Sequence, residues 1–449
     1  MDSLRFAARV AASDYVLRAH AQRHEKPTTV RFSLGYCISA SSRLLAEFSN
    51  FLFDPALADR VRRSPTAFTR NRTLTLPRMA ALMMSGMCAS VQTELDALFG
   101  ALDERGGRAR AVSAQAFSKA RRGLSAELFE LARAHLISLA RPHIDSMRWN
   151  GLRLVAADGS RLRVGTRRGH ELRADHYAFA LFLPGPELTL YAALHPADGA
   201  ERQMLFEALD ILQPHTDLLL LDRGYIGNTM VATLVQREIA FCMRVDARNW
   251  KCVNTFARSG KAECIVTLDA PGEQDAHDYE LTRTPSTVRL IRDVTPSGRV
   301  RVLMTSLLDS QRYPAACFGA LYHQRWRVEE AFKRLKHRLR LEAVTGLDYL
   351  ALQQDLGAKI LADNLCTLLS DLDVAHDDEC ASRPNRVYAR GALKPILGAC
   401  LLRIHHCLEG LASVLALIQQ NRCRIQPARS YPRPPRKAKP HCHLAYKFA

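Results

Sequence analysis

The sequence lacks several features that would place it in common classes of protein. No stretch reaches the roughly 18 uninterrupted apolar residues that a membrane-spanning helix needs. Residues 1–25 are interrupted by Arg, Asp and His before the apolar part of a secretory signal could form. No CxxC pair occurs among the twelve cysteines, so we expect reduced thiols and no disulfide framework. These absences predict a cytoplasmic protein.

A zinc site is also disfavoured by the spacing of the metal-ligating residues. The densest runs of such residues are 405–407, which reads His-His-Cys, and 441–443, which reads His-Cys-His. Neither has the paired spacing that encloses zinc tetrahedrally. We therefore interpret these residues as ordinary side chains and expect no zinc.

Positive charge, in contrast, is plentiful. The chain has 63 Lys and Arg against 45 Asp and Glu, for a formal net charge of +18 and a pI near 9.6. Such an excess favours a polyanionic partner, since each phosphate contact releases a condensed counterion. A membrane surface would attract the same charge, but double-stranded DNA is the partner that we expect.

Composition and periodicity divide the 449 residues into five segments. The first is helical and basic, which predicts a DNA-binding domain, although a solvated helical bundle with no DNA role has the same composition. Strand patterns and helix patterns then alternate, as in an α/β core, and a β-strand-rich insertion interrupts that core. The last segment is a basic, Pro-rich tail. The boundaries are 1–145 for the helical domain, 146–238 and 311–420 for the two parts of the core, 239–310 for the insertion, and 421–449 for the tail.

Two aspartates follow apolar runs in the first part of the core. Asp158 comes after LRLVAA and Asp222 after DLLLL. In α/β sheets, ligands collect beyond the carboxyl ends of strands, so we expect both side chains at one sheet edge. Each aspartate also occupies a common turn setting, and a purely structural role is an equal alternative. Asp217 is a rival to Asp222, but five residues along one strand would point the two side chains to opposite faces.

A third carboxylate lies on a predicted helix spanning Tyr322 to Arg340. At about 100° per residue, the polar side chains of this helix share a strip roughly 60° wide beside an apolar stripe. Glu330 falls well away from that stripe and is expected on the solvent side. The alternative is a surface helix on which two residues of the strip form an ordinary i, i+4 ion pair. The strip consists of Tyr322, Arg325, Glu329 and Lys336, and the stripe of Val328, Phe332, Leu335 and Leu339.

Two aspartates and a glutamate are the residue types that a two-metal phosphoryl-transfer site uses. Mg²⁺ prefers carboxylate oxygens and substrate phosphates, and two such ions can activate the attacking oxygen and stabilise the leaving one. Arg325 can bind a phosphate bidentately, while Lys336 can supply a point charge and Tyr322 a hydrogen bond. Trp326 could stack on an unpaired DNA base or could equally be a half-buried aromatic.

These motifs resemble the bacterial DDE transposases of the insertion-sequence family numbered four. The Tyr-Arg-Glu-Lys signature of that family is matched in every spacing by the strip on the predicted helix, and its aspartate motifs resemble VAADGS and LLLLDRGY. The resemblance covers roughly residues 152–342.

The resemblance implies an RNase H-like core in which Asp158, Asp222 and Glu329 bind divalent metal, either Mg²⁺ or Mn²⁺. It also implies cut-and-paste transposition through hairpin ends by a homodimer that binds the inverted repeats of an insertion sequence and a target DNA. Tyr322, Arg325, Trp326 and Lys336 would then contact DNA in a bacterial protein associated with the nucleoid.

Two other classes of function remain open at this stage. A transposase-derived DNA-binding protein that no longer cuts would keep the basic charge, but its intact carboxylates argue against it. A structure-specific nuclease would keep the metal site without strand transfer. The complete Tyr-Arg-Glu-Lys pattern favours a transposase over both.

Overall fold

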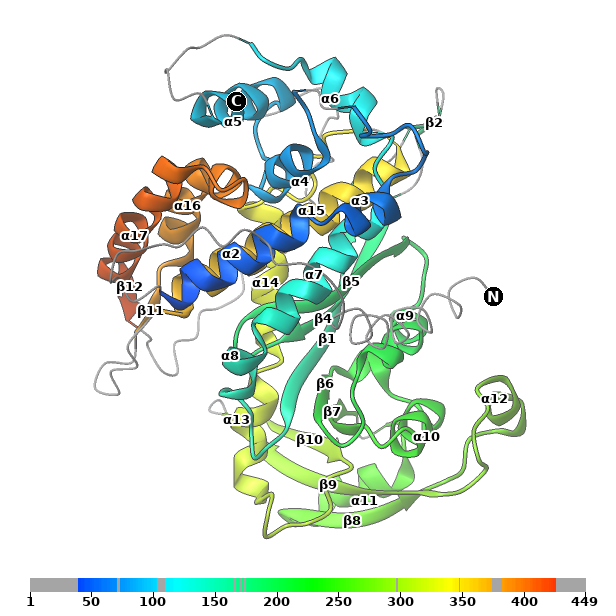
Figure 1. The fold of residues 1–449 in the computed structure, drawn as a ribbon. Helices are drawn as coiled ribbons and strands as arrows, with labels where there is room; N and C mark the ends of the chain where they lie inside the picture. The colour runs from blue at the N-terminus through cyan, green and yellow to red at the C-terminus, as the bar shows by residue number, and fades with distance from the viewer. Residues whose placement is uncertain are drawn as a thin grey trace, which may run out of the picture.

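A large mixed β-sheet forms the centre of the computed structural model (Figure 1). Its eight strands lie in the order β5-β4-β1-β6-β7-β10-β9-β8. The middle strands β1, β6 and β7 are parallel to one another, and the flanking strands are antiparallel. The structure describes residues 39–70, 73–102, 110–164, 167–168, 171–172, 175–246, 248–295, 298–346, 348–373 and 382–424. The strands are β1 (Arg153–Leu162), β4 (His176–Leu183), β5 (Leu188–Pro196), β6 (Asp217–Leu221), β7 (Ala240–Val245), β8 (Glu263–Leu268), β9 (Ser286–Val294) and β10 (Val300–Thr305).

Both faces of the central strands are buried. In β6 all five residues are buried, and alternate leucines belong to two different apolar clusters. Leu219 and Leu221 pack on one side of the sheet, and Leu218 and Leu220 on the other. Parallel strands covered on both faces are expected to be continuous apolar runs, which explains the LLLL sequence.

Helices cover the two faces of this sheet. The chain order strand, strand, strand, helix, strand, helix that the sequence predicts across the first part of the core is confirmed by β1, β4, β5, α9, β6 and α10. The helices that pack near the sheet are α9 (Glu201–Ala208), α10 (Asn228–Gln236), α11 (Lys251–Ser259), α13 (Phe318–His323), α14 (Trp326–His337) and α15 (Tyr349–Asp371). Together these elements make a mixed α/β protein.

The N-terminal helices share one core with the C-terminal ones. In Figure 1, α2 lies against α7, which packs on α15, and α16 and α17 lie beside them. Helices α3, α6 and α7 lie in the segments 55–63 and 114–140, and the Ser113 side chain caps α6. The elements of this helical layer are α2 (Ala40–Leu52), α3 (Pro55–Val61), α4 (Leu76–Met84), α5 (Val91–Leu102), α6 (Ala114–Arg121), α7 (Glu127–Leu139), α8 (Arg141–Asp145), α16 (Arg386–Leu401) and α17 (His405–Gln420).

The long helix α15 joins this helical layer to the sheet. It is buried on almost every side, and hydrogen bonds are made by five of its buried polar side chains: Gln354, Asp355, Lys359, Asn364 and Ser370. Asn364, for example, accepts from the Thr189 amide of β5 at 2.9 Å and donates to the Thr189 carbonyl at 3.0 Å. Such paired bonds satisfy groups that would be costly to bury alone, and they fix the helix against the edge of the sheet.

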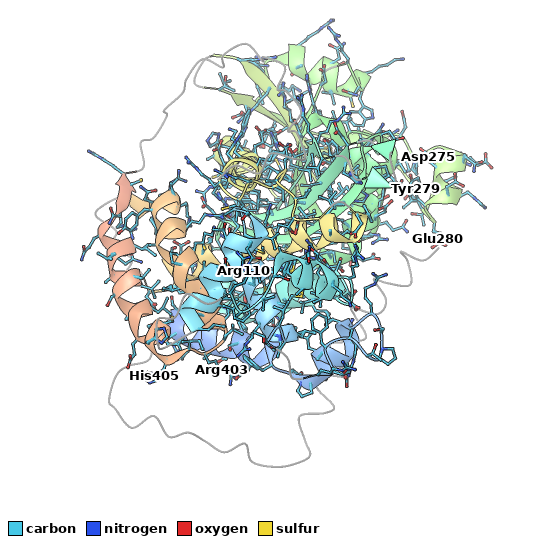
Figure 2. The ribbon with its side chains drawn as sticks, turned by 90° about the horizontal axis from the view of Figure 1, so that it is seen from above. Arg110, Asp275, Tyr279, Glu280, Arg403 and His405 are labelled. Atoms are coloured by element: carbon cyan, nitrogen blue, oxygen red, sulfur yellow. The ribbon has the colours of Figure 1, made fainter. Side chains whose placement is uncertain are left out.

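The segment 239–310 is rich in strands, and these strands continue the central sheet. Strand β7 pairs in parallel with β6, and β8 to β10 extend the sheet beyond β7. Two helices also interrupt the strands, α11 and α12 (Glu273–Asp278). Figure 2 shows α12 at the margin of the molecule, where Asp275, Tyr279 and Glu280 are labelled. The Tyr279 ring contacts Phe206 with centroids 4.4 Å apart.

The predicted helix over 322–340 is divided into α13 and α14. The division is a tightened turn in which Arg325 and Arg327 donate backbone hydrogen bonds three residues back, to Tyr322 and Gln324. Arg325 itself keeps helical angles, with φ −54° and ψ −34°. The side chains of the predicted strip therefore remain neighbours across the division.

Both ends of the chain include residues outside those described. Residues 1–38 and 425–449 fall there, so most of the basic tail, including the His-Cys-His run at 441–443, has no structural account. The strand β12 (Arg422–Arg424) pairs with β11 (Ser382–Pro384) before that point. Among the helices that the structure describes, none is long and apolar enough to cross a membrane.

Candidate active site

The two predicted aspartates lie side by side at the end of the parallel part of the sheet. The pairing of β1 with β6 ends at Ala156 and Leu220. Asp158 is two residues beyond that pair, and Asp222 follows β6 directly. The expectation that Asp158 would end its strand is wrong, because β1 continues to Leu162 by pairing with β4. The parallel pairing nevertheless stops where the sequence predicts.

Asp217, the rival to Asp222, has a structural role. Its side chain is fully buried, and both of its oxygens accept hydrogen bonds at 2.6 Å from the guanidinium of Arg153. The carboxylate also accepts from the backbone of Gln213 at 2.8 Å. The hydrogen bonds of this carboxylate are therefore made within the fold. Asp217 begins β6, whereas the candidate site lies beyond the other end of that strand.

Helix α14 brings Glu329 to the same edge of the sheet. The predicted apolar stripe is buried, which fixes the rotation of the helix. Glu329 remains 29% exposed at the margin of that packing, while Glu330 is exposed and contacts Lys333 on the solvent side as predicted. The buried residues of the stripe are Val328, Phe332, Leu335 and Leu339.

Arg325 lies among the three carboxylates. Its Nη2 is 2.9 Å from Glu329 and 3.9 Å from Asp222, and its positive charge also acts on Asp158. The side chain is only 3% exposed, and its Nε is buried without a hydrogen-bond partner in the part of the chain that the structure describes. The i, i+4 pair considered in the sequence therefore exists, but it belongs to a larger cluster of charges.

The other residues of the signature lie along the same edge. The Tyr322 hydroxyl is 3.4 Å from Asp222, and burial raises the pKa of this phenol. Lys336 donates to the Arg161 carbonyl of β1 at 2.5 Å. The Arg325 guanidinium lies over the half-buried ring of Trp326, and its Cζ is 5.4 Å from the centroid of that ring.

The surroundings of Asp158 strongly perturb its pKa. Burial raises its pKa to about 7, Arg325 opposes that rise, and the neighbouring Glu201 and Glu329 add to it. Neighbouring carboxylates disfavour the ionised form of a carboxyl group. A cation bound between them stabilises that ionised form.

Glu201, at the start of α9, is a fourth carboxylate, and it belongs to no motif that would have identified it from the sequence. Its side chain accepts a hydrogen bond from the Tyr177 hydroxyl of β4, and its charge raises the pKa of Asp158. Gly159 makes this contact possible, because a Cβ there would lie 2.1 Å from the Tyr177 ring. The glycine of the ADGS motif is therefore explained by the Tyr177 ring that lies across it.

The donor chemistry of the site fits a hard divalent cation. Asp158, Asp222 and Glu329 offer carboxylate oxygens, the ligands that Mg²⁺ prefers. Among the described residues, however, no three Asp, Glu, His or Cys side chains are already gathered closely enough to hold a metal ion. Arg325 donates a hydrogen bond to one oxygen of Glu329 in this arrangement.

The chain is similar to known transposases. Residues 149–365 match the family described as the transposase DDE domain, a range that contains all of the carboxylates above. The transposase InsG for insertion sequence element IS4, from Escherichia coli K12, is 25% identical over 339 residues, which cover 70% of this chain and 74% of InsG. A cryo-EM structure of a piggyBac transposase synaptic complex with hairpin DNA covers 83% of this chain and 85% of its own, at 11% identity and a TM-score of 0.43.

The domain match and the carboxylates at the edge of the sheet define a DDE transposase, an enzyme that cleaves DNA and depends on divalent metal. Its similarity to InsG relates the chain to the transposases of IS4 elements.

Proposed function

We propose that the chain carries out cut-and-paste transposition of an insertion sequence, with Asp158, Asp222 and Glu329 as the ligands of two Mg²⁺ ions. The observation that supports this most strongly is the meeting of all three carboxylates around Arg325 at the end of the parallel strands. When bound there, the metal ions supply activation of the attacking oxygen and stabilisation of the leaving one.

The residues around the carboxylates have complementary roles in this proposal. Arg325 neutralises the cluster before metal binds and is released when Glu329 becomes a ligand. Its fork of donors then faces a DNA phosphate beside the cut. Tyr322 orients Asp222 through its hydroxyl, Lys336 holds the phosphate backbone next to β1, and Trp326 stacks on an unpaired base.

The wider architecture follows the same proposal. We assign residues 146–238 and 311–420 to an RNase H-like core, residues 239–310 to a strand-rich insertion in it, and residues 1–145 to recognition of the inverted repeats. At each of the paired ends, a homodimer would first cleave one strand with water. The freed 3′-hydroxyl would then attack the opposite strand, which breaks that strand and closes a hairpin. Water would reopen the hairpin before the end joins target DNA.

The test is cleavage of a labelled duplex that ends in the inverted repeat of the element, with Mg²⁺ present. We expect a cut at the repeat boundary and a hairpin product. Binding without cleavage in both Mg²⁺ and Mn²⁺ would contradict the proposal and would instead favour an inactive DNA-binding descendant.

The release of Arg325 predicts a stability effect that does not depend on activity. We expect Arg325→Gln to lower the thermal unfolding midpoint in EDTA, because three carboxylates lose their neutralising cation. Added Mn²⁺ should then raise the midpoint more in the variant than in the wild type, since no guanidinium competes for Glu329. Lys333→Gln is the control, because Lys333 contacts exposed Glu330 on the far side of the helix. An equal Mn²⁺ shift in Arg325→Gln and the wild type would exclude this competition.

The basic tail should contribute to DNA affinity by charge alone. Ending the chain after Arg424 keeps β12 and removes six basic residues. We expect weaker DNA binding and a slope of log affinity against log salt that is smaller by up to about 5, at roughly 0.9 per phosphate contact. Binding titrations at several salt concentrations measure this slope, and an unchanged slope would show that the tail does not contact phosphate. The residues removed include Arg429, Arg433, Arg436, Lys437, Lys439 and Lys447.

A further inference from the structure

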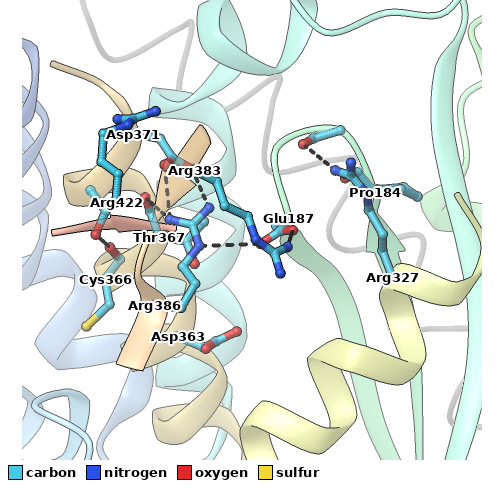
Figure 3. A network of polar contacts seen from close by, with 12 residues as sticks. Pro184, Glu187, Arg327, Asp363, Cys366, Thr367, Asp371, Arg383, Arg386 and Arg422 are labelled. Carbon is cyan, nitrogen blue, oxygen red and sulfur yellow. Dashed lines mark hydrogen bonds and ion pairs between the residues drawn. The ribbon is translucent and has the colours of Figure 1, made fainter. Parts of the chain in front are cut away.

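A basic cleft lies on another face of the helix that carries Glu329. It has a volume of about 610 Å³ and is bordered by α14, α15, the start of α16 and the turn between β4 and β5 (Figure 3). Arg334 of α14 contacts Asp363 of α15 on this side, whereas Lys336 contacts β1 on the side of the carboxylates. The cleft is therefore separate from the candidate active site but within one helix diameter of it, about 10 Å.

The charges that line this cleft are not balanced. Seven lysines and arginines border it, against three acidic residues. Asp371 adds one further carboxylate by pairing with Arg386 at 2.6 Å, which still leaves an excess of three positive charges. The basic residues are Arg327, Lys333, Arg334, Arg338, Arg383, Arg386 and Arg390, and the acidic ones are Glu187, Glu330 and Asp363.

Inside the cleft, the guanidiniums outnumber the carboxylates that pair with them. Glu187 alone faces three guanidiniums at 3.4 to 3.7 Å. The Nε of Arg334 is buried without a hydrogen-bond partner within the described part of the chain. Arg327 donates to the Pro184 carbonyl at 2.8 Å, and Figure 3 shows it reaching from α14 toward that turn. Burial lowers the pKa of Arg327, and three neighbouring arginines lower it further against the opposing charge of Glu187.

We propose that this cleft is a second phosphate-binding surface, which holds the backbone of duplex DNA next to the active site. The inference rests on the proposed function, since it assigns a further contact to the same DNA. Guanidiniums fixed in a recess suit phosphate oxygens, which accept their paired donors. Contacts to phosphate carry no sequence information, so we expect the surface to act on any duplex.

The test removes positive charge at exposed rim positions and keeps the pairs of Glu187 with Arg334 and Arg386. The cleft variant combines Lys333→Gln, Arg338→Gln and Arg383→Gln, all at exposed positions. The matched control combines Arg258→Gln, Lys261→Gln and Arg299→Gln, which removes the same charge from exposed positions near the β8 edge of the sheet. Thermal unfolding midpoints confirm that both variants fold.

Binding is measured by fluorescence anisotropy in EDTA, with one duplex that ends in the inverted repeat and one unrelated duplex, between about 50 and 200 mM salt. We expect the cleft variant to bind both duplexes at least about 10-fold more weakly at low salt. Its salt slope should be smaller by about 2 to 3, at roughly 0.9 per phosphate. The control variant should bind like the wild type.

Several outcomes would overturn the proposal. An unchanged slope in the cleft variant, an equal loss in the control, or a loss limited to the repeat duplex would each do so. Wild-type protein that binds neither duplex would instead contradict the proposed function as a whole. If the wild type cleaves DNA and the cleft variant binds DNA as the wild type does, the proposal of a second phosphate-binding surface is contradicted and the proposed function is not.

Discussion

Replacement of Glu329 by glutamine is expected to lower the rate of DNA cleavage by at least about 100-fold. Loss of a group that merely supports a metal ligand typically costs 10- to 100-fold in affinity or activity, and Glu329 is proposed as a ligand itself. The amide keeps the size of the side chain and can still accept from Arg325, so the fold should persist. DNA affinity in EDTA should change little, because the substitution removes no positive charge.

Glu330→Gln provides a matched control for this experiment. It makes the same chemical change one residue along the same helix, at an exposed position that contacts only Lys333 among the contacts described. Single-turnover cleavage of the repeat duplex should be near the wild-type rate in this variant. Equal losses in the two variants, or lost DNA binding in Glu329→Gln, would contradict the assignment of Glu329 to the metal.

The second large effect is expected on stability, at the contact between α6 and α15. Arg121 is buried there and donates to Asp355 at 3.0 Å, to Gln354 at 2.9 Å and to Thr345 at 2.5 Å. Arg121→Leu would leave the Asp355 carboxylate buried without its cation. Removing one partner of a buried ion pair typically costs about 3–5 kcal/mol.

Thermal unfolding measures this effect directly. A loss of that size should lower the midpoint by several degrees. Arg122→Leu is the control, since the neighbouring arginine is exposed and its side chain has no ion pair among the described residues. A midpoint for Arg121→Leu within a degree of the control would show that the N-terminal helices are not coupled to α15 through this network.

The elements that the sequence predicts correctly are those fixed by local periodicity. The apolar run ending at Leu221 had to be a strand buried on both faces, and the stripe from Val328 to Leu339 had to face the core. These two patterns also determine where Asp222 and Glu329 point. The position of the carboxylates therefore follows from patterns a few residues long.

What the sequence does not predict depends on contacts between distant residues. Glu201 and Tyr177 come to the site because α9 packs beside β1, and neither belongs to a motif. The burial of Arg325 likewise depends on three separate elements meeting around it. The continuation of the sheet through β8 to β10 also requires pairing with β7, which no local pattern specifies.

The basic cleft also depends on contacts between residues that are distant in the sequence, so local patterns do not predict it. Arg327 and Arg334 could be interpreted from the sequence as the solvated face of an amphipathic helix. Only the packing of α14 near α15 and α16 brings them together with Arg386 around Glu187.

The central claim is that Asp158, Asp222 and Glu329 form one metal site. The most direct measurement is the anomalous diffraction of manganese in crystals of the protein with a repeat-ended duplex. We predict manganese at the three carboxylates, in one or both of the proposed ion positions, with ligand distances of about 2.1 Å and Glu329 separated from Arg325. Manganese bound elsewhere, or these carboxylates still paired with Arg325 in the presence of metal and DNA, would contradict the account.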